Sequence, residues 1–317
     1  DCYVCSNWRD ENGTNRFYCE KQQRDASGNC DGYSSANRCR RKCAKMNKVS
    51  INQVGIKRGN KIIQRPRVDY ETNKSVWDFR GFKLVQDNVK ENMNKSLELA
   101  SKAASQKVNV FLLQELFQTQ YFCSTQNSKF FDLAITFPNS EIFEVFSNFC
   151  KHHKIVIPIS FFEKYGQNYF NSLVLIDSKG KLSDIYRKSH IPDGPGYNEK
   201  FYFTPGNTGF KVFDTEYGKI GCGICWDQWF PECARSMTLL GADMILYPTA
   251  IGSEPQDPNL NSKKHWENVM IGHSAANQIP IISSNRIGEE IEDDIKINFY
   301  GGSFITDHLG SIQAQMD

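Results

Sequence analysis

The chain has 317 residues, enough to bury a large core as one α/β domain or as two smaller domains. Its 38 Lys and Arg residues nearly balance its 36 Asp and Glu residues, and a net charge of +2 does not indicate a nucleic-acid or membrane-surface partner. No apolar run approaches the roughly 20 residues that a membrane-spanning helix needs, and no signal-peptide core follows Asp1. A first residue other than Met indicates a processed chain or a fragment.

Residues 1–47 form a polar, cysteine-rich segment of unknown role. Three interpretations of it are open. It is a secreted disulfide module, in which Asn12-Gly13-Thr14 would be a glycosylation site. It binds zinc, as the C-x2-C spacing of Cys2 and Cys5 allows, although the other spacings match no zinc template and the segment has no His. It is foreign to the rest of the chain, which its different composition favours. The cysteines of this segment are Cys2, Cys5, Cys19, Cys30, Cys39 and Cys43.

Residues 48–86 are irregular and basic, which indicates a linker or an insertion. Two stretches in it could form a first strand, residues 49–53 and residues 81–86. The first would leave a long insertion before the next element, and the second would leave only a short loop.

A compact pattern of helices and strands begins near residue 87. The period of 87–105 predicts a helix with Val89, Met93, Leu97 and Ala100 on its buried face. Further helices are predicted over 140–152, 231–240 and 264–277. Strands are predicted over 108–113, 155–160, 171–176, 185–188, 209–213, 219–224, 244–247, 279–284 and 302–306. Because hairpins interrupt the alternation of strand and helix, the fold class is α/β with a mixed sheet and helices outside it.

Three polar residues stand where predicted strands end: Glu115, Lys188 and Cys225. Loops at the carboxyl ends of strands collect site residues in α/β proteins. Pro231 begins the helix that follows Cys225, and the positive end of a helix favours a thiolate. Each residue also has a structural interpretation: a buried thiol, a helix-capping or salt-bridge acid, and a surface lysine.

Together these three residue types make a workable set for nucleophilic catalysis. Glu115 can take the thiol proton of Cys225, and Lys188 can stabilise the oxyanion of a tetrahedral intermediate. The backbone N–H of Trp226, directly after the thiol, can donate a second hydrogen bond to that oxyanion.

Longer motifs around these residues resemble the nitrilase (carbon-nitrogen hydrolase) superfamily and, within it, the N-carbamoylputrescine amidases. The resemblance covers roughly residues 87–317. It implies a four-layer αββα sandwich with mixed sheets, and neither a metal nor an organic cofactor. The motifs that carry the resemblance are residues 112–117, 186–197, 199–203, 225–232 and 247–255.

The resemblance also implies roles for individual residues. Cys225 would be the nucleophile, Glu115 the general base and Lys188 the oxyanion-binding cation. Glu199 matches a second acid that the family places beside the lysine. The implied reaction is hydrolysis of N-carbamoylputrescine to putrescine, carbon dioxide and ammonia through a carbamoyl group on the cysteine.

Such a substrate ends in an ammonium group, so its pocket should offer an acid or an aromatic ring at the far end. Glu254 and Asp257 are the candidate acids, and Trp229 is a candidate lining residue beside Trp226. The alternatives are solvated loop acids and ordinary core aromatics.

The pattern departs from the family at both ends. The first strand is ambiguous, and the family continues past the strand at 302–306 with another strand and a tail that helps to build a subunit interface. We therefore expect an incomplete fold, and a homo-oligomer where these ends are present. The five remaining cysteines are interpreted as reduced thiols of a cytoplasmic enzyme. Two other functions stay open: another ureido or amide hydrolase such as a 3-ureidopropionase, and a catalytically inactive binding or scaffold protein.

Overall fold

The structure is a computed structural model that describes residues 2–9, 15–22, 51–52, 55–56 and 88–316. The described residues divide into two compact units. The smaller unit contains an antiparallel hairpin of β1 (Cys2–Arg9) and β2 (Asn15–Gln22), whose register places Cys5 opposite Cys19. The larger unit contains the remaining elements and is described below by itself.

Several predictions for the N-terminal part lie outside the described residues. They are the glycosylation motif at 12–14, most of the linker at 48–86 and the candidate first strand at 81–86. The other candidate strand, 49–53, overlaps β3 (Ile51–Asn52), which pairs antiparallel with β4 (Gly55–Ile56).

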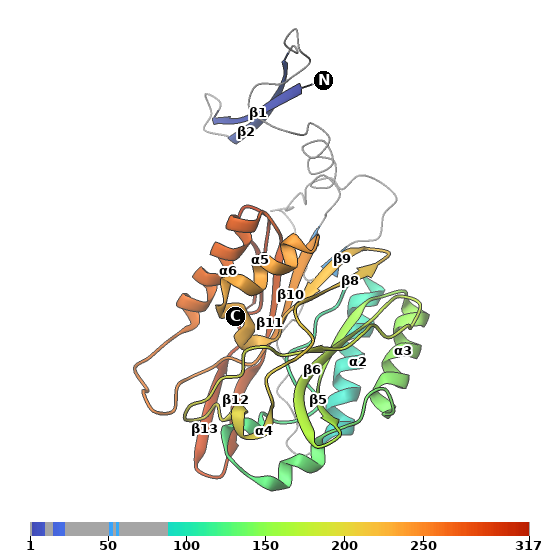
Figure 1. The fold of residues 1–317 in the computed structure, drawn as a ribbon, viewed down its shortest axis with the longest axis vertical. Coiled ribbons are helices and arrows are strands. Elements are labelled where there is room, and N and C mark those ends of the chain that lie inside the picture. Colours follow the sequence, from blue (N-terminus) through green and yellow to red (C-terminus); the bar gives the residue numbers. More distant parts are fainter. Residues whose placement is uncertain (1, 10–14, 23–50, 53–54, 57–87, 317) are drawn as a thin grey trace. The chain divides into compact units, whose positions relative to one another are not determined.

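The larger unit alternates helices and strands with interrupting hairpins (Figure 1). Its helices are α2 (Val89–Ser105), α3 (Glu141–His153), α4 (Glu199–Tyr202), α5 (Pro231–Leu239) and α6 (Lys263–Asn277), with the 3-10 helices η1 (Phe122–Ser124), η2 (Ser128–Leu133) and η3 (Cys225–Trp229). Its further strands are β5 (Ile157–Tyr165), β6 (Asn168–Ile176), β7 (Tyr186–Arg187), β8 (Lys211–Thr215), β9 (Gly218–Cys222), β10 (Met244–Thr249), β11 (Ile281–Asn285), β12 (Ile287–Glu292), β13 (Ile295–Tyr300), β14 (Phe304–Thr306) and β15 (Ile312–Gln315).

Two sheets form the centre of this unit. One has the order β15-β14-β11-β10-β9-β8, in which β9, β10 and β11 run parallel and the other strands pair antiparallel. The other is the antiparallel sheet β5-β6-β7. Helices α5 and α6 pack together beside the six-stranded sheet, and α2 and α3 pack together beside the other sheet (Figure 1). The predicted mixed α/β fold is therefore confirmed.

Central strands of this kind are buried on both faces, so they favour apolar residues along their whole length. All six residues of β10 are buried. An apolar cluster fills the space between the six-stranded sheet and α5 and α6, and includes Met237, Tyr247, Trp266 and Phe304. This core fixes the carboxyl ends of β9 and β10, which lead directly into the loops at Cys225 and Ala250.

The predicted buried face of α2 is confirmed at Ala100 and wrong at Val89, while Met93 and Leu97 are only partly buried. Val89 is exposed, and the buried stripe of the helix consists of Asn92, Ser96, Ala100 and Ala103. These residues are small or hydrogen-bonded: the Ser96 hydroxyl donates to the Asn92 carbonyl at 2.8 Å. Small side chains let neighbouring elements approach closely, which a count of large apolar residues does not detect.

Two strand predictions also change. Residues 108–113 are buried but form no regular strand: a single parallel bridge joins Val110 to Val156, just before β5. There the Phe111 N–H donates to the Val156 carbonyl and the Val156 N–H donates to the Asn109 carbonyl. The strand expected to be missing after 302–306 is present as β15, which pairs with β14. Its turn is stabilised by the Asp307 carboxylate, which accepts from the N–H groups of Leu309 and Ser311.

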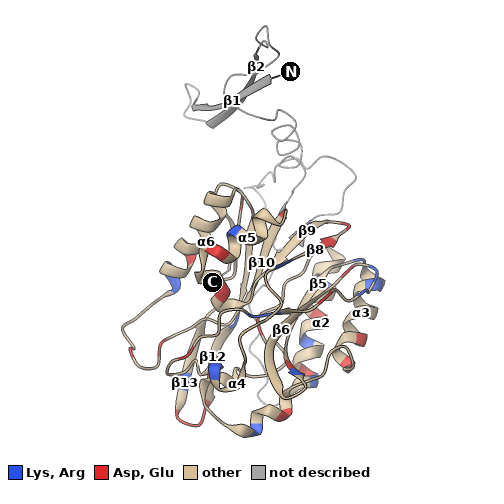
Figure 2. Cartoon of the chain, viewed as in Figure 1, with Lys and Arg blue, Asp and Glu red and all other residues tan. Residues whose placement is uncertain are grey.

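Charged residues of both signs are interspersed on the outer helices (Figure 2). Helix α2 carries Glu91 in its first turn and Lys102 in its last, and α3 begins with Glu141 and ends with basic residues. These placements match the helix macrodipoles. Of the helices in the described ranges, none combines the length and the apolar character needed to cross a bilayer.

The loop before β8 approaches the β7 strand so closely that only glycine fits. The Gly206 N–H donates to the Lys188 carbonyl at 2.8 Å, and a Cβ at Gly206 would lie 2.1 Å from the Arg187 carbonyl oxygen. We expect Gly206→Ala to destabilise the fold by about 1–3 kcal/mol and to lower the Tm by roughly 3–10 °C. Gly194→Ala is the matched control in a thermal scan, because a Cβ there would meet no atom within 4 Å. Equal Tm values for both variants would contradict this packing.

Candidate active site

The strand ends bring one lysine between two carboxylates. Lys188, directly after β7, donates to Glu115 Oε1 at 2.9 Å and to Glu199 Oε2 at 2.6 Å. All three side chains are fully buried. Glu115 follows the buried segment 108–113, and Glu199 begins α4. Charges are retained in an interior only when they are paired and hydrogen-bonded, and this triplet meets that condition.

Two neutral side chains also donate hydrogen bonds to the carboxylates. Asn171 Nδ2, on β6, donates to Glu115 Oε1 at 2.7 Å. The Tyr121 hydroxyl donates to Glu199 Oε1 at 2.7 Å. The second oxygen of Glu115, Oε2, is buried and has no hydrogen-bond partner within the part of the chain that the structure describes. That oxygen is therefore available to accept a proton.

Cys225 lies in the same charged environment. It follows β9 through Gly223 and Ile224 and begins η3 with a φ of 40°, a strained conformation for any residue other than glycine. Its Sγ is buried, 3.8 Å from the Ala250 carbonyl oxygen at the end of β10. Gly223 is required because a Cβ there would lie 2.6 Å from the Tyr247 ring. Strain of this kind, at a residue that bears a reactive atom, indicates a functional constraint.

The thiol of Cys225 is protonated at rest. Burial raises its pKa well above the usual value, Glu115 and Glu199 raise it further, and Lys188 lowers it. The expectation of a thiolate stabilised by the following helix is therefore wrong, because burial and the two carboxylates outweigh the cation. A thiol in this setting needs a base during its reaction, and the unpaired oxygen of Glu115 suits that role.

The pKa values of Lys188 and Glu199 are both raised, which favours the charged form of the lysine and the neutral form of the glutamate. Burial alone would lower the pKa of Lys188, but Glu115 and Glu199 raise it well above its usual value, so the ammonium persists. Burial raises the pKa of Glu199 to about 7, against the lowering effect of Lys188. Glu199 therefore changes its charge near neutral pH while Lys188 does not.

Tyr121 and Asn171 were not predicted from the sequence. Asn171 left one signal, since it begins a predicted apolar strand at a position that the structure buries completely. Tyr121 left none, because it lies in an irregular loop 78 positions from its partner Glu199.

The proposed substrate-binding acids differ in their surroundings. Glu254 is half-buried after β10, and its charge, after burial, is the largest of the effects that raise the pKa of Tyr197. Cys225 contributes to the same shift, so both groups lie within electrostatic range of Tyr197. Asp257 is exposed and accepts from the Asn259 N–H.

Trp229 and Trp226 differ in their burial. Trp229 is partly buried against the apolar cluster under α5 and α6, and its ring meets that of His265 at 4.9 Å. Trp226 is exposed to 36% and packs edge-on against Phe230. Their roles in substrate binding, and that of the Trp226 N–H in oxyanion binding, stay predictions.

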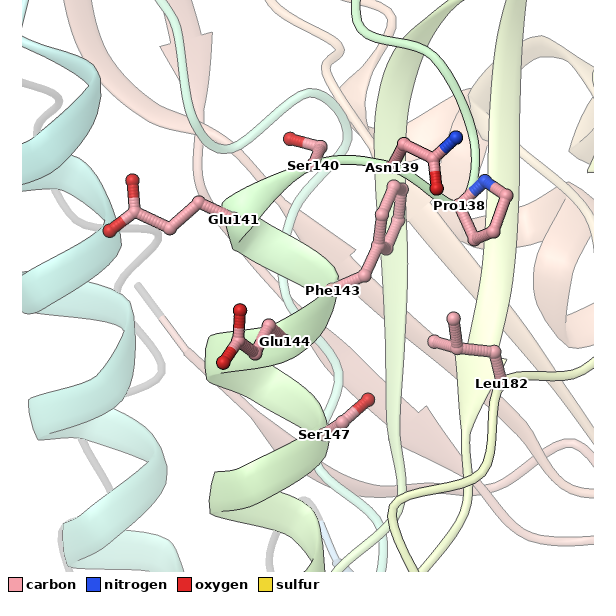
Figure 3. Close-up of a pocket in the computed structure, with 8 residues that line it drawn as sticks. All are labelled: Pro138, Asn139, Ser140, Glu141, Phe143, Glu144, Ser147 and Leu182. Carbon is pink, nitrogen blue, oxygen red and sulfur yellow. The ribbon is translucent and has the colours of Figure 1, made fainter.

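A hollow at the start of α3 is separate from this cluster (Figure 3). Two acids, Glu141 and Glu144, and the ring of Phe143 line it, and none of the strand-end residues does. It is open to solvent, and its lining has two serine hydroxyls but no cysteine, lysine or histidine beside them. The cluster of Lys188, Glu115, Glu199 and Cys225 is therefore the candidate for the reaction chemistry.

The five cysteines outside the N-terminal segment are free thiols, as predicted. They are Cys123, Cys150, Cys222, Cys225 and Cys233, and all are buried. Within residues 88–316 and the short N-terminal strands, no three His, Cys, Asp or Glu side chains are grouped so that they could hold a metal ion.

A comparison with known families identifies the family of the chain. Residues 80–317 match the carbon-nitrogen hydrolase family. The chain belongs to this family. Among curated relatives, it is 52% identical to a citrullinase of Francisella tularensis over 231 residues, which cover 73% of this chain and 81% of that protein. It is 50% identical to an N-carbamoylputrescine amidase of Oryza sativa over 226 residues, which cover 70% and 75%.

Solved structures of the carbon-nitrogen hydrolase family share the fold. A carbon-nitrogen hydrolase of Helicobacter pylori aligns with a TM-score of 0.69 and 40% identity, covering 73% of this chain and 81% of that one. An amidase from Nesterenkonia aligns with a TM-score of 0.62 at 20% identity, covering 73% and 81%, and so supports the fold alone. The chain is therefore a hydrolase of linear amide or ureido compounds.

The opposite effects of Glu199 and Lys188 on Cys225 can be measured by alkylation with iodoacetamide. Glu199→Gln should speed alkylation at pH 8 by a factor on the order of 3–10, because it removes a charge that raises the pKa of the thiol. Lys188→Met should slow it. Since Glu199 is charged only above its pKa of about 7, the ratio of Glu199→Gln to wild-type rates should approach one at pH 6. A ratio that is independent of pH would contradict the shifted pKa.

Proposed function

We propose that the chain hydrolyses N-carbamoylputrescine to putrescine, carbon dioxide and ammonia. The observation that carries the reaction type is the buried Lys188 ammonium, held by Glu115 and Glu199 beside the strained thiol of Cys225. The four-layer αββα sandwich expected from the sequence is part of this proposal, with the site between its two sheets.

In the first half of the reaction, Glu115 Oε2 takes the thiol proton as Cys225 Sγ attacks the ureido carbon. Lys188 and the Trp226 N–H stabilise the negative charge that develops on the ureido oxygen. The tetrahedral intermediate collapses, Glu115 returns the proton to the leaving nitrogen, and ammonia departs. A carbamoyl thioester remains on the sulfur.

In the second half, Glu115 takes a proton from a water molecule as the water oxygen attacks the thioester carbon. Glu115 then returns this proton to the leaving sulfur, which regenerates the thiol. The released carbamate decays to carbon dioxide and putrescine. Glu199 keeps Lys188 in place throughout. This division of labour suits a thiol whose pKa is raised, because each half-reaction begins with proton transfer to the same carboxylate.

The substrate is supported by two observations. The chain is about 50% identical to curated N-carbamoylputrescine amidases of Oryza sativa, Arabidopsis thaliana and Solanum lycopersicum. Glu254 is half-buried in the loop after β10, and both it and Cys225 lie within electrostatic range of Tyr197. An acid there suits the terminal ammonium of N-carbamoylputrescine.

Citrulline is the second candidate substrate, because the similarity to a citrullinase reaches 52% identity. Citrulline carries the same ureido group and an ammonium, and adds a carboxylate at its far end. A 3-ureidopropionase would bind a carboxylate alone, for which Glu254 is unfavourable. An inactive scaffold would leave no purpose for the strained Cys225.

The reaction is tested by ammonia release from N-carbamoylputrescine, citrulline and 3-ureidopropionate. We expect the highest kcat/KM with N-carbamoylputrescine and a loss of at least about 10³-fold in Cys225→Ala. Cys222→Ala is the matched control, because it removes another buried thiol three residues away and should retain activity. Equal rates in Cys225→Ala and the wild type would refute the nucleophile, and a preference for citrulline would reassign the substrate.

The far end of the pocket is tested by neutralising its acids one at a time. Glu254→Gln should raise KM for N-carbamoylputrescine roughly tenfold with kcat little changed, because a partly desolvated ion pair contributes about 1–2 kcal/mol to binding. Asp257→Asn should have a smaller effect, since Asp257 is exposed. A larger effect of Asp257→Asn, or no effect of either variant, would place the ammonium elsewhere.

A further inference from the structure

One buried carboxylate connects the segment of Lys188 to the segment of Cys225. Asp227 is fully buried. Its Oδ1 accepts from the His190 N–H at 3.0 Å and lies 2.8 Å from His190 Nδ1. Its Oδ2 accepts from the Tyr186 hydroxyl at 2.7 Å and from the Ile224 N–H at 2.9 Å. Four polar contacts therefore converge on this one side chain.

The sequence positions of these partners give the contact its meaning. Tyr186 lies two residues before Lys188, and His190 lies two residues after it. Ile224 directly precedes Cys225. The Asp227 side chain thus contacts both flanks of the lysine and the backbone next to the thiol.

The same residue closes the turn that strains Cys225. The Asp227 N–H donates to the Ile224 carbonyl at 3.0 Å, while the Ile224 N–H donates back to Oδ2. These reciprocal bonds enclose Cys225 and Trp226. A backbone conformation of positive φ costs about 1–3 kcal/mol and persists only where its surroundings hold it.

The histidine partner is fixed from a second side. The His190 ring stacks on the Phe230 ring, with centroids 3.6 Å apart and an interplanar angle of 8°. Its Nδ1 edge faces Asp227, so a hydrogen on that nitrogen is donated to the carboxylate. The imidazole therefore connects the loop after Lys188 to Asp227 of η3 and to Phe230, which directly follows η3.

We infer that Asp227 is a positioning residue, which sets the placement of the Cys225 thiol relative to the Lys188 ammonium. The inference rests on the proposed function. A carboxylate is required because its two oxygens each receive two contacts. An amide would offer one oxygen and would direct an NH₂ group at the remaining donors, leaving them unpaired. A misplacement of about 1 Å between catalytic groups can lower a rate by about 10²-fold.

The test compares Asp227→Asn and Tyr186→Phe with a control, Tyr247→Phe. Tyr186 and Tyr247 are both fully buried, but the Tyr247 hydroxyl contacts Cys233 and has no bond to either catalytic segment. With protein concentrations normalised to folded protein, Asp227→Asn should lower kcat by about tenfold or more with KM changed less than about threefold. Tyr186→Phe should lower kcat severalfold, and Tyr247→Phe should leave it within about twofold.

The double variant separates positioning from general destabilisation. If the Tyr186 hydroxyl acts through Asp227, adding Tyr186→Phe to Asp227→Asn should lower kcat no further. Should Asp227→Asn fail to fold, Tyr186→Phe against Tyr247→Phe still decides the question. The inference is overturned if Tyr186→Phe and Tyr247→Phe have equal kcat values, or if Asp227→Asn lowers the Tm without lowering kcat.

Alkylation keeps this test independent of the substrate. If the wild type is inactive on every ureido compound, the proposed function fails, but the rate of Cys225 alkylation by iodoacetamide is still measurable. Because Lys188 lowers the pKa of Cys225, moving the two apart should slow alkylation of Asp227→Asn by about threefold or more. Equal rates in Asp227→Asn, Tyr247→Phe and the wild type would then overturn the positioning role by itself.

Discussion

The structure around the site depends on the burial of one ammonium group. Lys188 has no exposure to solvent, and an unpaired charge there would destabilise the fold by several kcal/mol. Two carboxylates compensate it, but they add one more negative charge than the lysine neutralises. The raised pKa of Glu199 relieves that excess near neutral pH. Donation from Asn171 and Tyr121 relieves it further, because each gives a hydrogen bond to one carboxylate.

A cluster of buried charges requires a rigid backbone, and Arg286 provides it for Glu115. The Arg286 guanidinium is fully buried, and its Nη2 donates to the carbonyl groups of Glu115 and Leu116 at 3.0 and 3.1 Å. Its Nη1 donates to the Thr119 carbonyl and to the Glu290 carboxylate. Leu116 adopts a φ of 48°, so the chain turns sharply directly after the base. Arg286 therefore does for Glu115 what Asp227 does for the Cys225 turn. In both cases a charged side chain binds backbone groups that regular secondary structure leaves unpaired.

The sequence predicted the groups that lie at strand ends and not the groups that hold them. Glu115, Lys188 and Cys225 were found because a polar residue after an apolar run is a local signal. Tyr121, Asn171 and Tyr186 bond to partners 78, 56 and 41 positions away, and no local pattern records such pairs. Other differences have the same origin. The face of α2 was predicted only in part, because close packing of small residues has no hydrophobic period. Strand β15 was missed because four residues with two glutamines carry a weak strand signal. The Cys225 thiol was expected to be a thiolate because a helix begins after it, but its burial, which a sequence does not record, raises its pKa.

The same network also explains why substrate identity is harder to assign than reaction type. In the proposed mechanism, Lys188, Glu115 and Cys225 act only on the ureido group, which N-carbamoylputrescine and citrulline share. Relatives acting on either compound can therefore be equally similar to this chain, at 50% and 52% identity. Discrimination must come from the far end, where the two compounds differ by one carboxylate. If Glu254 lines that end, as proposed above, its carboxylate would repel the carboxylate of citrulline, which is the one group that N-carbamoylputrescine lacks. The proposed function thus separates two tasks: the buried network carries the reaction chemistry, and the loop after β10 that holds Glu254 selects the substrate.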